Sequence, residues 1–208
     1  MAVTCLVVGL NEWERFTEPM IESCRNHAPD LRLLIVDNGS QPSYPIVDGA
    51  MVVRSDEPLS YAGGINYGMQ HTNDDWVMVV NNDVLIHKPI TERIENLDQN
   101  CLHGFHLAHK GQESPFAWDY LSGWCLIACR GLWQAVGDFD ENCKPMYFED
   151  ADYSIRAVKA GFGLILHDRE EWGVEHLGNE RHKERRQTMN KMMTQRKLIM
   201  RYVRAKHG

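Results

Sequence analysis

The sequence predicts an α/β protein with a central, mostly parallel sheet flanked by helices. Short apolar runs rich in β-branched residues begin at Val3, Leu31 and Trp76, and such runs are typical of strands covered on both faces. Stretches with helical character separate these runs, and alternating strands and helices build parallel sheets with right-handed crossovers. The composition of the 208 residues, 43% hydrophobic and 25% charged, fits one folded domain and excludes a disordered chain.

In the first half of the chain each element has its own signal. Apolar residues at helical spacing predict a helix over residues 13–27. Turn residues at 37–40 end a strand, and the pair Gly63 and Gly64 opens a second helix that extends to about residue 72. The strands expected around these helices cover residues 3–9, 31–36, 51–53 and 76–80.

The second half of the chain is less regular. The elements expected there are helices at residues 90–97, 149–160 and 183–204 and strands at residues 104–108, 121–128 and 163–167. Gly161 ends the second of these helices, as glycine commonly does. Because no repeat or long linker divides the chain, we predict one domain over residues 1–180 and a basic, amphipathic helical extension over residues 181–208.

The apolar runs are too short to cross a membrane, since the longest, such as residues 76–80, fall far below the roughly 18 to 20 residues required. The N-terminus carries no positive charge before its apolar run, so we expect no signal peptide. The six cysteines form no CxxC pair and no zinc-ribbon spacing, and we expect all of them to be reduced. These features predict a cytoplasmic protein.

Charge is distributed unevenly along the chain. The formal net charge is −7, yet residues 181–208 contain ten Lys or Arg and one acidic residue, so this segment carries +9 and the first 180 residues carry −16. One interpretation is that the basic segment faces an anionic partner, such as phosphates, a nucleic acid or a lipid surface. The other is that it forms a solvated helix face docked on the acidic body. The charges alone leave both interpretations open.

Polar residues directly after the expected strands are the first candidates for a site, because ligands bind beyond the carboxyl ends of parallel strands. Asp37 could accept hydrogen bonds from a nucleoside, although on spacing alone an Asx-type turn is the stronger interpretation. Asp83 could bind Mg2+ or Mn2+ or could again be a turn residue. The remaining residues at these strand ends are Asn11, Asn38, Asn81 and Asn82.

Three further features carry two interpretations each. The GGxNxG segment at residues 63–68 could approach a phosphate at a helix N-terminus, but it is neither a P-loop nor a dinucleotide fingerprint. The acids Glu149, Asp150 and Asp152 suit a first helical turn, where Asp152 can also pair with Arg156 at i,i+4. Beside a bulky segment they could instead have raised pKa values suited to general-base catalysis. His176 is either a structural histidine or a ligand.

Eight segments, taken in order, carry a resemblance to a known family. They are Val7–Asn11, Val36–Ser40, Ala62–Gly68, Val80–Val84, Ser122–Ile127, Val136–Glu141, Phe148–Arg156 with Lys159–Phe162, and His176–Gly178. Together they resemble family 2 glycosyltransferases of the GT-A fold, the inverting nucleotide-sugar enzymes that include rhamnosyl- and glucosyltransferase-like proteins. The resemblance covers roughly residues 3–178 and implies a single Rossmann-like GT-A domain.

The resemblance implies a donor site. Asp37 would contact the base or ribose of the donor, and Gly123 and Trp124 would lie where the donor sugar and the acceptor meet. Three residues of the glycine-rich segment would line the nucleotide pocket: Gly63, Gly64 and Asn66. The other residues implied in donor binding are Asn11, Asn38 and Asn82.

The resemblance also implies a metal site and a base. Asp83 matches the final acid of the DXD-type metal motif, and His176 matches the histidine that helps to hold metal or diphosphate. Asp150 matches the acid that deprotonates the acceptor hydroxyl, with Glu149 supporting it. The implied cofactor is Mn2+ or Mg2+, because a divalent cation neutralises the charge that develops on the leaving nucleoside diphosphate.

The implied reaction moves a hexosyl or pentosyl group, with a UDP-sugar as the expected donor. The acceptor is open, and the candidates are a glycan, a lipid-linked saccharide or a modified DNA base such as a hydroxymethylpyrimidine. An anionic acceptor or surface would contact the basic residues Arg181, Lys183, Arg185 and Arg186. Asn81 replaces the first acid of the metal motif and so favours an alternative, a catalytically inert nucleotide- or nucleic-acid-binding module of the same fold.

Overall fold

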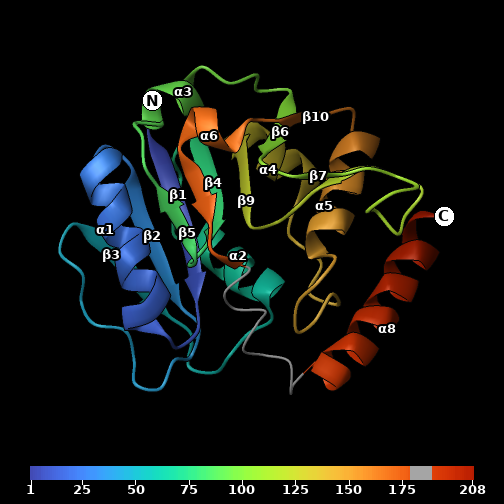
Figure 1. The fold of residues 1–208 in the computed structure, drawn as a ribbon, viewed down its shortest axis with the longest axis horizontal. Coiled ribbons are helices and arrows are strands. Elements are labelled where there is room, and N and C mark those ends of the chain that lie inside the picture. Colours follow the sequence, from blue (N-terminus) through green and yellow to red (C-terminus); the bar gives the residue numbers. More distant parts are fainter. Residues whose placement is uncertain (179–188) are drawn as a thin grey trace.

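The computed structural model describes residues 1–178 and 189–208, and its centre is a seven-stranded sheet flanked by helices (Figure 1). The order across the sheet is β10, β6, β9, β4, β1, β2, β3. These strands are β1 (Val3–Gly9), β2 (Arg32–Asp37), β3 (Ala50–Arg54), β4 (Trp76–Asn81), β6 (Cys101–Gly104), β9 (Cys125–Cys129) and β10 (Gly163–Leu166). β9 is antiparallel to both β4 and β6, whereas the other pairs are parallel, which confirms a mostly parallel sheet.

Helices cover both faces of this sheet. A π-helical turn, Trp13–Thr17, leads into α1 (Glu18–His27). The other helices are α2 (Tyr61–Met69), α3 (Thr91–Glu95), α4 (Arg130–Val136), α5 (Glu149–Lys159), α6 (Arg169–Trp172) and α8 (Met189–His207). Two short antiparallel pairs lie outside the sheet: β5 (Val84–Ile86) with β11 (Val174–His176), and β7 (Leu107–Ala108) with β8 (Tyr120–Leu121).

The core follows from the alternation of side chains along the central strands. In β1, Cys5 and Val7 pack on one face with residues of α1, α3 and α6, whereas Leu6 and Val8 pack on the other with residues of α2, α4 and α5. Successive strand residues point to opposite faces, so a strand that is apolar throughout must be covered on both sides. The continuous apolar runs of the sequence therefore encode the three-layer arrangement.

Most predicted elements are present, with ends shifted by a few residues, but two predicted strands are wrong as single elements. Residues 104–108 contain the end of β6 and the separate strand β7. Residues 121–128 are likewise divided between β8 and β9. The division arises because Leu107 pairs with Leu121 outside the main sheet, while Gly104 pairs with Leu126 inside it. The short elements β5, α4 and α6 carried no signal that was recognised in the sequence.

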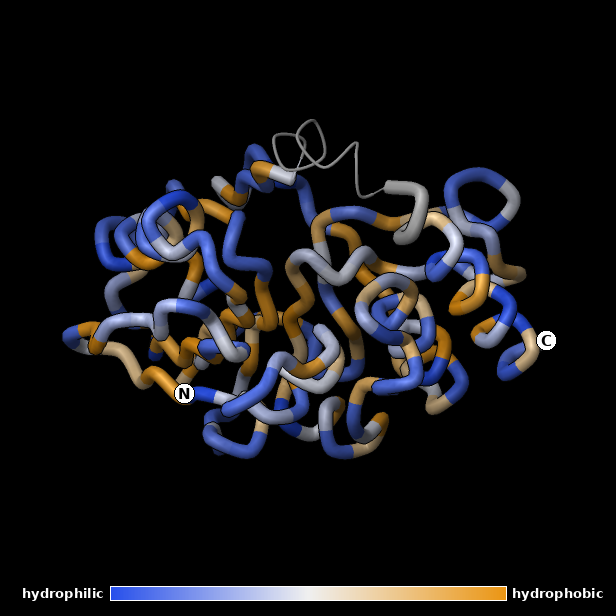
Figure 2. The backbone as a smooth tube through the Cα atoms, turned by 90° about the horizontal axis from the view of Figure 1, so that it is seen from below, coloured by the Kyte–Doolittle hydropathy of each residue, from blue (hydrophilic) through white to orange (hydrophobic). Residues whose placement is uncertain are grey.

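The C-terminal helix α8 docks on the body beside α5 (Figure 1). Ile199 and Val203 are buried with Phe116, Phe148 and Ile155 in a third apolar cluster. Residues 183–188 of the predicted helix lie outside the described residues. Hydrophobic and hydrophilic residues alternate along the backbone near the C-terminus (Figure 2). Among the described residues, no helix is long and apolar enough to span a bilayer.

Candidate active site

Asp37 lies at the carboxyl end of β2 and organises the loop that follows. Its Oδ1 accepts a hydrogen bond from the Ser40 amide at 2.9 Å, and its Oδ2 accepts one from the Tyr44 amide at 3.0 Å and pairs with Arg54. Burial raises the pKa of Asp37, but the hydrogen bonds from Ser40, Tyr44 and Arg54 outweigh it, so the pKa lies below the ordinary value. Asp37 is thus an ionised loop anchor, as the turn interpretation predicted.

Asn11 and Asn38 belong to the same group of loops. The Asn11 amide donates to Ser40 Oγ at 2.8 Å, and the Asn11 side-chain oxygen accepts from the Gln41 amide at 2.8 Å. Asn38 is buried, and its side chain makes hydrogen bonds to the amide and the carbonyl of Leu59 at 2.8 and 3.1 Å. The strand-end residues that the sequence singled out at β1 and β2 are therefore brought together.

The glycine-rich segment forms α2 and packs against β1. A Cβ atom added to Gly64 would lie 2.7 Å from Val8 Cγ1, so glycine is needed for this close approach. Asn66 is buried and makes two hydrogen bonds with the backbone of Phe139, at 2.8 and 2.9 Å. Gly63 lies in the first turn of α2, where its amide donates to Oγ of the N-cap residue Ser60 at 3.0 Å. The segment fixes helix and loop positions around the strand ends.

Asp83 and His176 are brought together by the pairing of β5 with β11. His176 Nε2 lies 3.4 Å from Asp83 Oδ1, and the His176 ring stacks on Trp124 with centroids 4.8 Å apart and an interplanar angle of 7°. Asn82, between β4 and β5, instead donates to Thr17 Oγ1 at 2.8 Å in the core. Asp83 and His176 therefore point to one place, whereas Asn82 points elsewhere.

This pair fits a divalent cation that takes further ligands from a bound molecule. A carboxylate with an imidazole suits Mn2+, and a hard cation commonly binds one or two protein groups while phosphate oxygens and water complete its shell. Within residues 1–178 and 189–208 there is no group of three or more His, Cys, Asp or Glu that could hold a metal alone. A cation would therefore depend on oxygens supplied by a ligand.

Tyr61 is a site residue that the sequence reasoning missed. Its hydroxyl donates to Asn81 Oδ1 at 2.6 Å, and Asn81 stands at the first position of the predicted metal motif. Burial and the negative charges of Glu149, Asp83 and Asp150 raise the pKa of Tyr61 well above its ordinary value. The Tyr61 hydroxyl therefore stays protonated, and it lies within reach of the charges of both Asp83 and Asp150. Its position directly after an N-cap serine was the available signal.

Asp150 lies on the first turn of α5. Its Oδ2 accepts a hydrogen bond from the Gly123 amide at 2.7 Å, and its Oδ1 accepts one from the Ala151 amide at 2.8 Å. A Cβ on Gly123 would lie 2.8 Å from Asp150 Cβ, so only glycine admits the carboxylate here. The carbonyl of the next residue, Trp124, accepts from the Asn81 amide at 2.9 Å. The Gly123–Trp124 segment thus contacts both Asp150 and Asn81 at the end of β4.

The buried Glu149 and the partly buried Asp150 form an acidic pair. Burial and the Asp150 charge raise the pKa of Glu149 to about 8, and in the described part of the chain Glu149 Oε2 has no hydrogen-bond partner. Burial also raises the pKa of Asp150, against the opposing effect of its backbone hydrogen bonds. Adjacent buried carboxyls that interact titrate as a pair, so this pair retains a proton near neutral pH.

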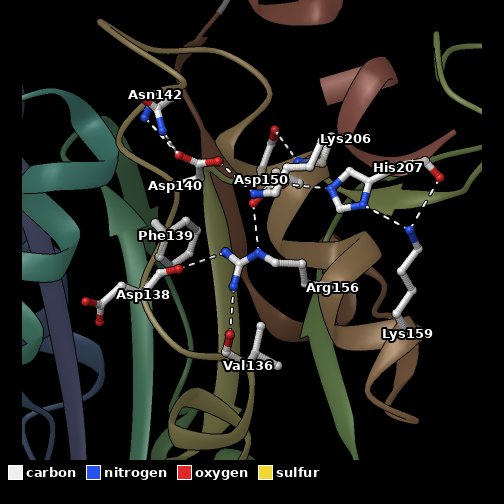
Figure 3. Close-up of polar contacts among 12 residues, drawn as sticks. Val136, Asp138, Phe139, Asp140, Asn142, Asp150, Arg156, Lys159, Lys206 and His207 are labelled. Carbon is white, nitrogen blue, oxygen red and sulfur yellow. Dashed lines mark hydrogen bonds and ion pairs between the residues drawn. The ribbon is translucent and has the colours of Figure 1, made fainter. Parts of the chain in front are cut away.

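Asp152 belongs to a different environment, although it lies on the same helical turn. It accepts hydrogen bonds from Arg156 at 2.8 Å and from His207 at 2.8 Å, and Lys206 lies 2.7 Å away. Burial raises the pKa of Asp152, but Lys206, His207 and Arg156 outweigh it and hold the pKa below its ordinary value. Arg156 also reaches the carbonyls of Val136 and Asp138 (Figure 3). Asp152 is thus a structural ion-pair residue.

The predicted contact residues for an anionic acceptor, Arg181, Lys183, Arg185 and Arg186, lie outside the described residues. The described part of the extension uses several of its cations internally. Lys206 contacts Asp140 and Asp152, and Arg204 donates to the Pro115 carbonyl at 2.7 and 3.0 Å. For residues 195–207 the structure therefore matches the interpretation of a helix docked on the acidic body.

Comparisons with known proteins identify a family and a fold. Residues 4–152 match the sequence model of the family described as Glycosyl transferase family 2. No curated protein matches the chain by sequence.

Solved structures with a similar fold are distant in sequence. The mannosyltransferase PcManGT from Pyrobaculum calidifontis, in complex with GDP-Man and Mn2+, matches with a TM-score of 0.60 and 15% identity, over 80% of this chain and 54% of that chain. S. aureus TarS matches with a TM-score of 0.61 and 14% identity, over 81% and 35%. A TarS fragment in complex with UDP matches with a TM-score of 0.60 and 14% identity, over 81% and 58%. The chain thus spans about a third to somewhat over half of these proteins.

Proposed function

Because the chain belongs to glycosyl transferase family 2, we propose that it transfers a sugar from a nucleoside-diphosphate sugar to an acceptor hydroxyl with inversion. One observation supports the proposal: Trp124 stacks on the ring of His176, the partner of Asp83, and the preceding residue, Gly123, donates its amide to Asp150, so one short segment contacts both the Asp83–His176 pair and the Asp150 carboxylate. Inverting transfer requires one group at the leaving diphosphate and a base at the attacking hydroxyl, because these two stand on opposite faces of the sugar.

On the donor side, Asp83 and His176 would hold Mn2+ or Mg2+, which would neutralise charge on the departing diphosphate. The loops anchored by Asp37, together with Asn11 and Asn38, would receive the nucleoside. Fold relatives described with GDP-Man or with UDP support a nucleotide donor of this class, and we propose a UDP-sugar. Gly63, beside the N-cap of α2, is the residue of the glycine-rich segment best placed to approach it.

On the acceptor side, Asp150 would take the proton of the attacking hydroxyl. The Gly123 amide holds one of its oxygens, so the carboxylate is oriented before the acceptor arrives. Glu149 would support it through the proton that the buried pair retains near neutral pH. Attack from this side of the sugar, opposite the leaving diphosphate, inverts the anomeric centre.

The acceptor class follows least directly from the described residues. We propose that the transferred group is hexosyl or pentosyl and that the acceptor is a glycan, a lipid-linked saccharide or a hydroxymethylpyrimidine in DNA. The basic segment that contains Arg181, Lys183, Arg185 and Arg186 would contact an anionic acceptor or surface.

A donor and acceptor screen tests this function. The full chain is incubated with Mn2+ and a panel of UDP- and GDP-sugars, and nucleoside diphosphate release and thermal stabilisation are measured. Donors that respond are then offered glycan, lipid-linked and hydroxymethylated DNA acceptors, with products read by mass spectrometry. We expect stabilisation by a nucleoside diphosphate and slow donor hydrolysis; no response to any donor would leave the inert-module alternative.

A further inference from the structure

The segment that leads into the acidic pair has an uncommon backbone. Tyr147 and Phe148, directly before Glu149, have positive φ angles of 91° and 63°. Residues other than glycine rarely adopt this conformation, and it persists where the surrounding structure holds it in place. Because Glu149 and Asp150 follow at once, whatever holds Tyr147 and Phe148 also determines where the two carboxylates lie.

Helix α8 contacts this segment from its N-terminal half. The guanidinium carbon of Arg196 lies 5.2 Å from the centre of the Phe148 ring and 5.8 Å from that of Tyr147, so one cation covers both rings. The neighbouring Gln195 donates a hydrogen bond of 3.1 Å to the carbonyl of Lys144. Phe148 is itself buried against apolar residues of α8.

The C-terminal half of α8 is fixed on both sides of the same segment. Lys206 Nζ lies 2.7 Å from both Asp140 Oδ2 and Asp152 Oδ1, and Tyr202 donates to Asp140 at 2.7 Å. His207 Nε2 lies 2.8 Å from Asp152 Oδ1 (Figure 3). These contacts hold Asp140 and Asp152, which lie before and after Tyr147 and Phe148 in the sequence. Helix α8 is therefore attached to both ends of the loop that carries these two aromatic residues.

We propose that α8 is a positioning element for the acidic pair and that Arg196 is its central positioning residue, acting through Phe148 and Tyr147. Arg196 holds the two rings, the rings hold the left-handed backbone, and the backbone positions Glu149 and places Asp150 beside the Gly123 amide. The effect on turnover rests on the proposed function, whereas the effect on the segment itself does not.

Hydrogen–deuterium exchange of the full-length protein tests the positioning directly. Arg196→Ala is compared with Arg196→Lys, which keeps a cation over the rings, and with Lys197→Ala, which removes an exposed cation from the same helix. We expect faster exchange at residues 144–152 in Arg196→Ala, exchange nearer to wild type in Arg196→Lys, and no change in Lys197→Ala. Unchanged exchange in Arg196→Ala would overturn the proposal.

A kinetic comparison then separates positioning from a general loss of structure. With Mn2+ and a responding nucleotide sugar, we expect Arg196→Ala to lower kcat for donor hydrolysis by at least about tenfold while the donor KM stays unchanged, because only the base is misplaced. Faster exchange with an unchanged kcat, or a kcat loss shared equally by Lys197→Ala, would overturn the positioning role. If wild type turns over no donor, the proposed function fails, and the exchange result still decides whether Arg196 holds the segment.

Discussion

The two sides of the candidate site hold their buried carboxylates in opposite ways. Asp37 is 1% exposed, and backbone amides and Arg54 occupy both of its oxygens, so its pKa is low. Glu149 is 7% exposed, yet its Oε2 has no hydrogen-bond partner among the residues described, and its pKa is raised to about 8. Burial alone therefore does not determine protonation. Several fixed donors keep the Asp37 carboxylate charged, whereas burial and the Asp150 charge keep Glu149 protonated.

The contacts that hold Asp37 and those that hold the acidic pair also differ in their separation along the sequence. The partners of Asp37 lie between residues 40 and 54, so that loop is nearly self-contained. The acidic pair is held by the Gly123 amide and, through its leading segment, by α8. Changes on the Asp37 side should therefore act locally on stability, and changes on the other side should act on catalysis through distant residues.

The largest expected effect concerns the cation. Asp83→Asn removes the carboxylate of the Asp83–His176 pair, so we expect Mn2+-dependent binding of a nucleoside diphosphate to weaken by about 100-fold. Isothermal titration with and without Mn2+ measures it. Glu175→Gln, an exposed change beside His176, is the matched control and should bind like wild type. Equal Mn2+ dependence in Asp83→Asn and wild type would remove Asp83 from the cation site.

Next in size is the ion pair on the Asp37 side. Arg54→Met leaves a buried carboxylate without its cation, and we expect a loss of about 2 kcal/mol in the free energy of unfolding at pH 7. Because the folded-state pKa of Asp37 is lowered, its stabilisation is present above the unfolded pKa of about 3.9 and is lost as the pH falls through the folded pKa. Urea unfolding at pH 7 and pH 3 should show the variant's deficit shrinking in acid. A deficit that is constant with pH would contradict this account.

The acidic pair has the opposite pH dependence. Since the pKa of Glu149 is raised to about 8 in the folded protein, the folded state binds more protons than the unfolded state between roughly pH 4.5 and 8. Its contribution is present below this range and is lost as the pH rises through it. We expect Glu149→Gln, which cannot ionise, to gain about 1 to 2 kcal/mol relative to wild type between pH 5 and pH 9. Parallel stability curves for the two proteins would show that Glu149 is not held protonated.

The smallest expected effect is on the docking of α8. Lys206→Ala removes a partly exposed amine that contacts Asp140 and Asp152, and we expect a loss of about 1 kcal/mol by thermal or urea unfolding. Arg156 and His207 remain on Asp152, which limits the loss. Lys197→Ala is the control and should change stability by less than about 0.5 kcal/mol. Identical losses in the two variants would show that these ion pairs do not anchor α8.

Features encoded locally could be predicted from the sequence. Apolar runs such as Trp76–Val80 identified the buried strands, and the acids from Glu149 onward with Gly161 identified α5. The order of the motifs then identified the family and proposed Asp83, His176 and Asp150 as site residues. The structure brings Asp83 and His176 together and places Asp150 at the Gly123 amide, and the roles of all three stay predictions.

Features created by tertiary pairing could not be predicted in this way. Residues 121–128 are divided between β8 and β9 because the two parts pair with different strands, β7 and β6. Tyr61 is identified as a site residue by its hydrogen bond to Asn81, which depends on how α2 packs. The acids at the start of α5 illustrate the limit well. Spacing predicted that Asp152 can pair with Arg156, and the structure confirms this pair. The contacts of Asp152 with Lys206 and His207, and the backbone amides around Asp150, come from segments distant in sequence or from local backbone geometry and were not predicted.

The most direct test of the two-sided account is a comparison of wild type and Asp150→Asn with one responding nucleotide sugar and Mn2+. Binding of the nucleoside diphosphate and release of it from the donor are measured on the same samples. The account predicts unchanged binding and a loss of at least about 100-fold in release, because the base is removed and the donor side is intact. Release by Asp150→Asn at the wild-type rate would contradict the account, as would a parallel loss of binding and release.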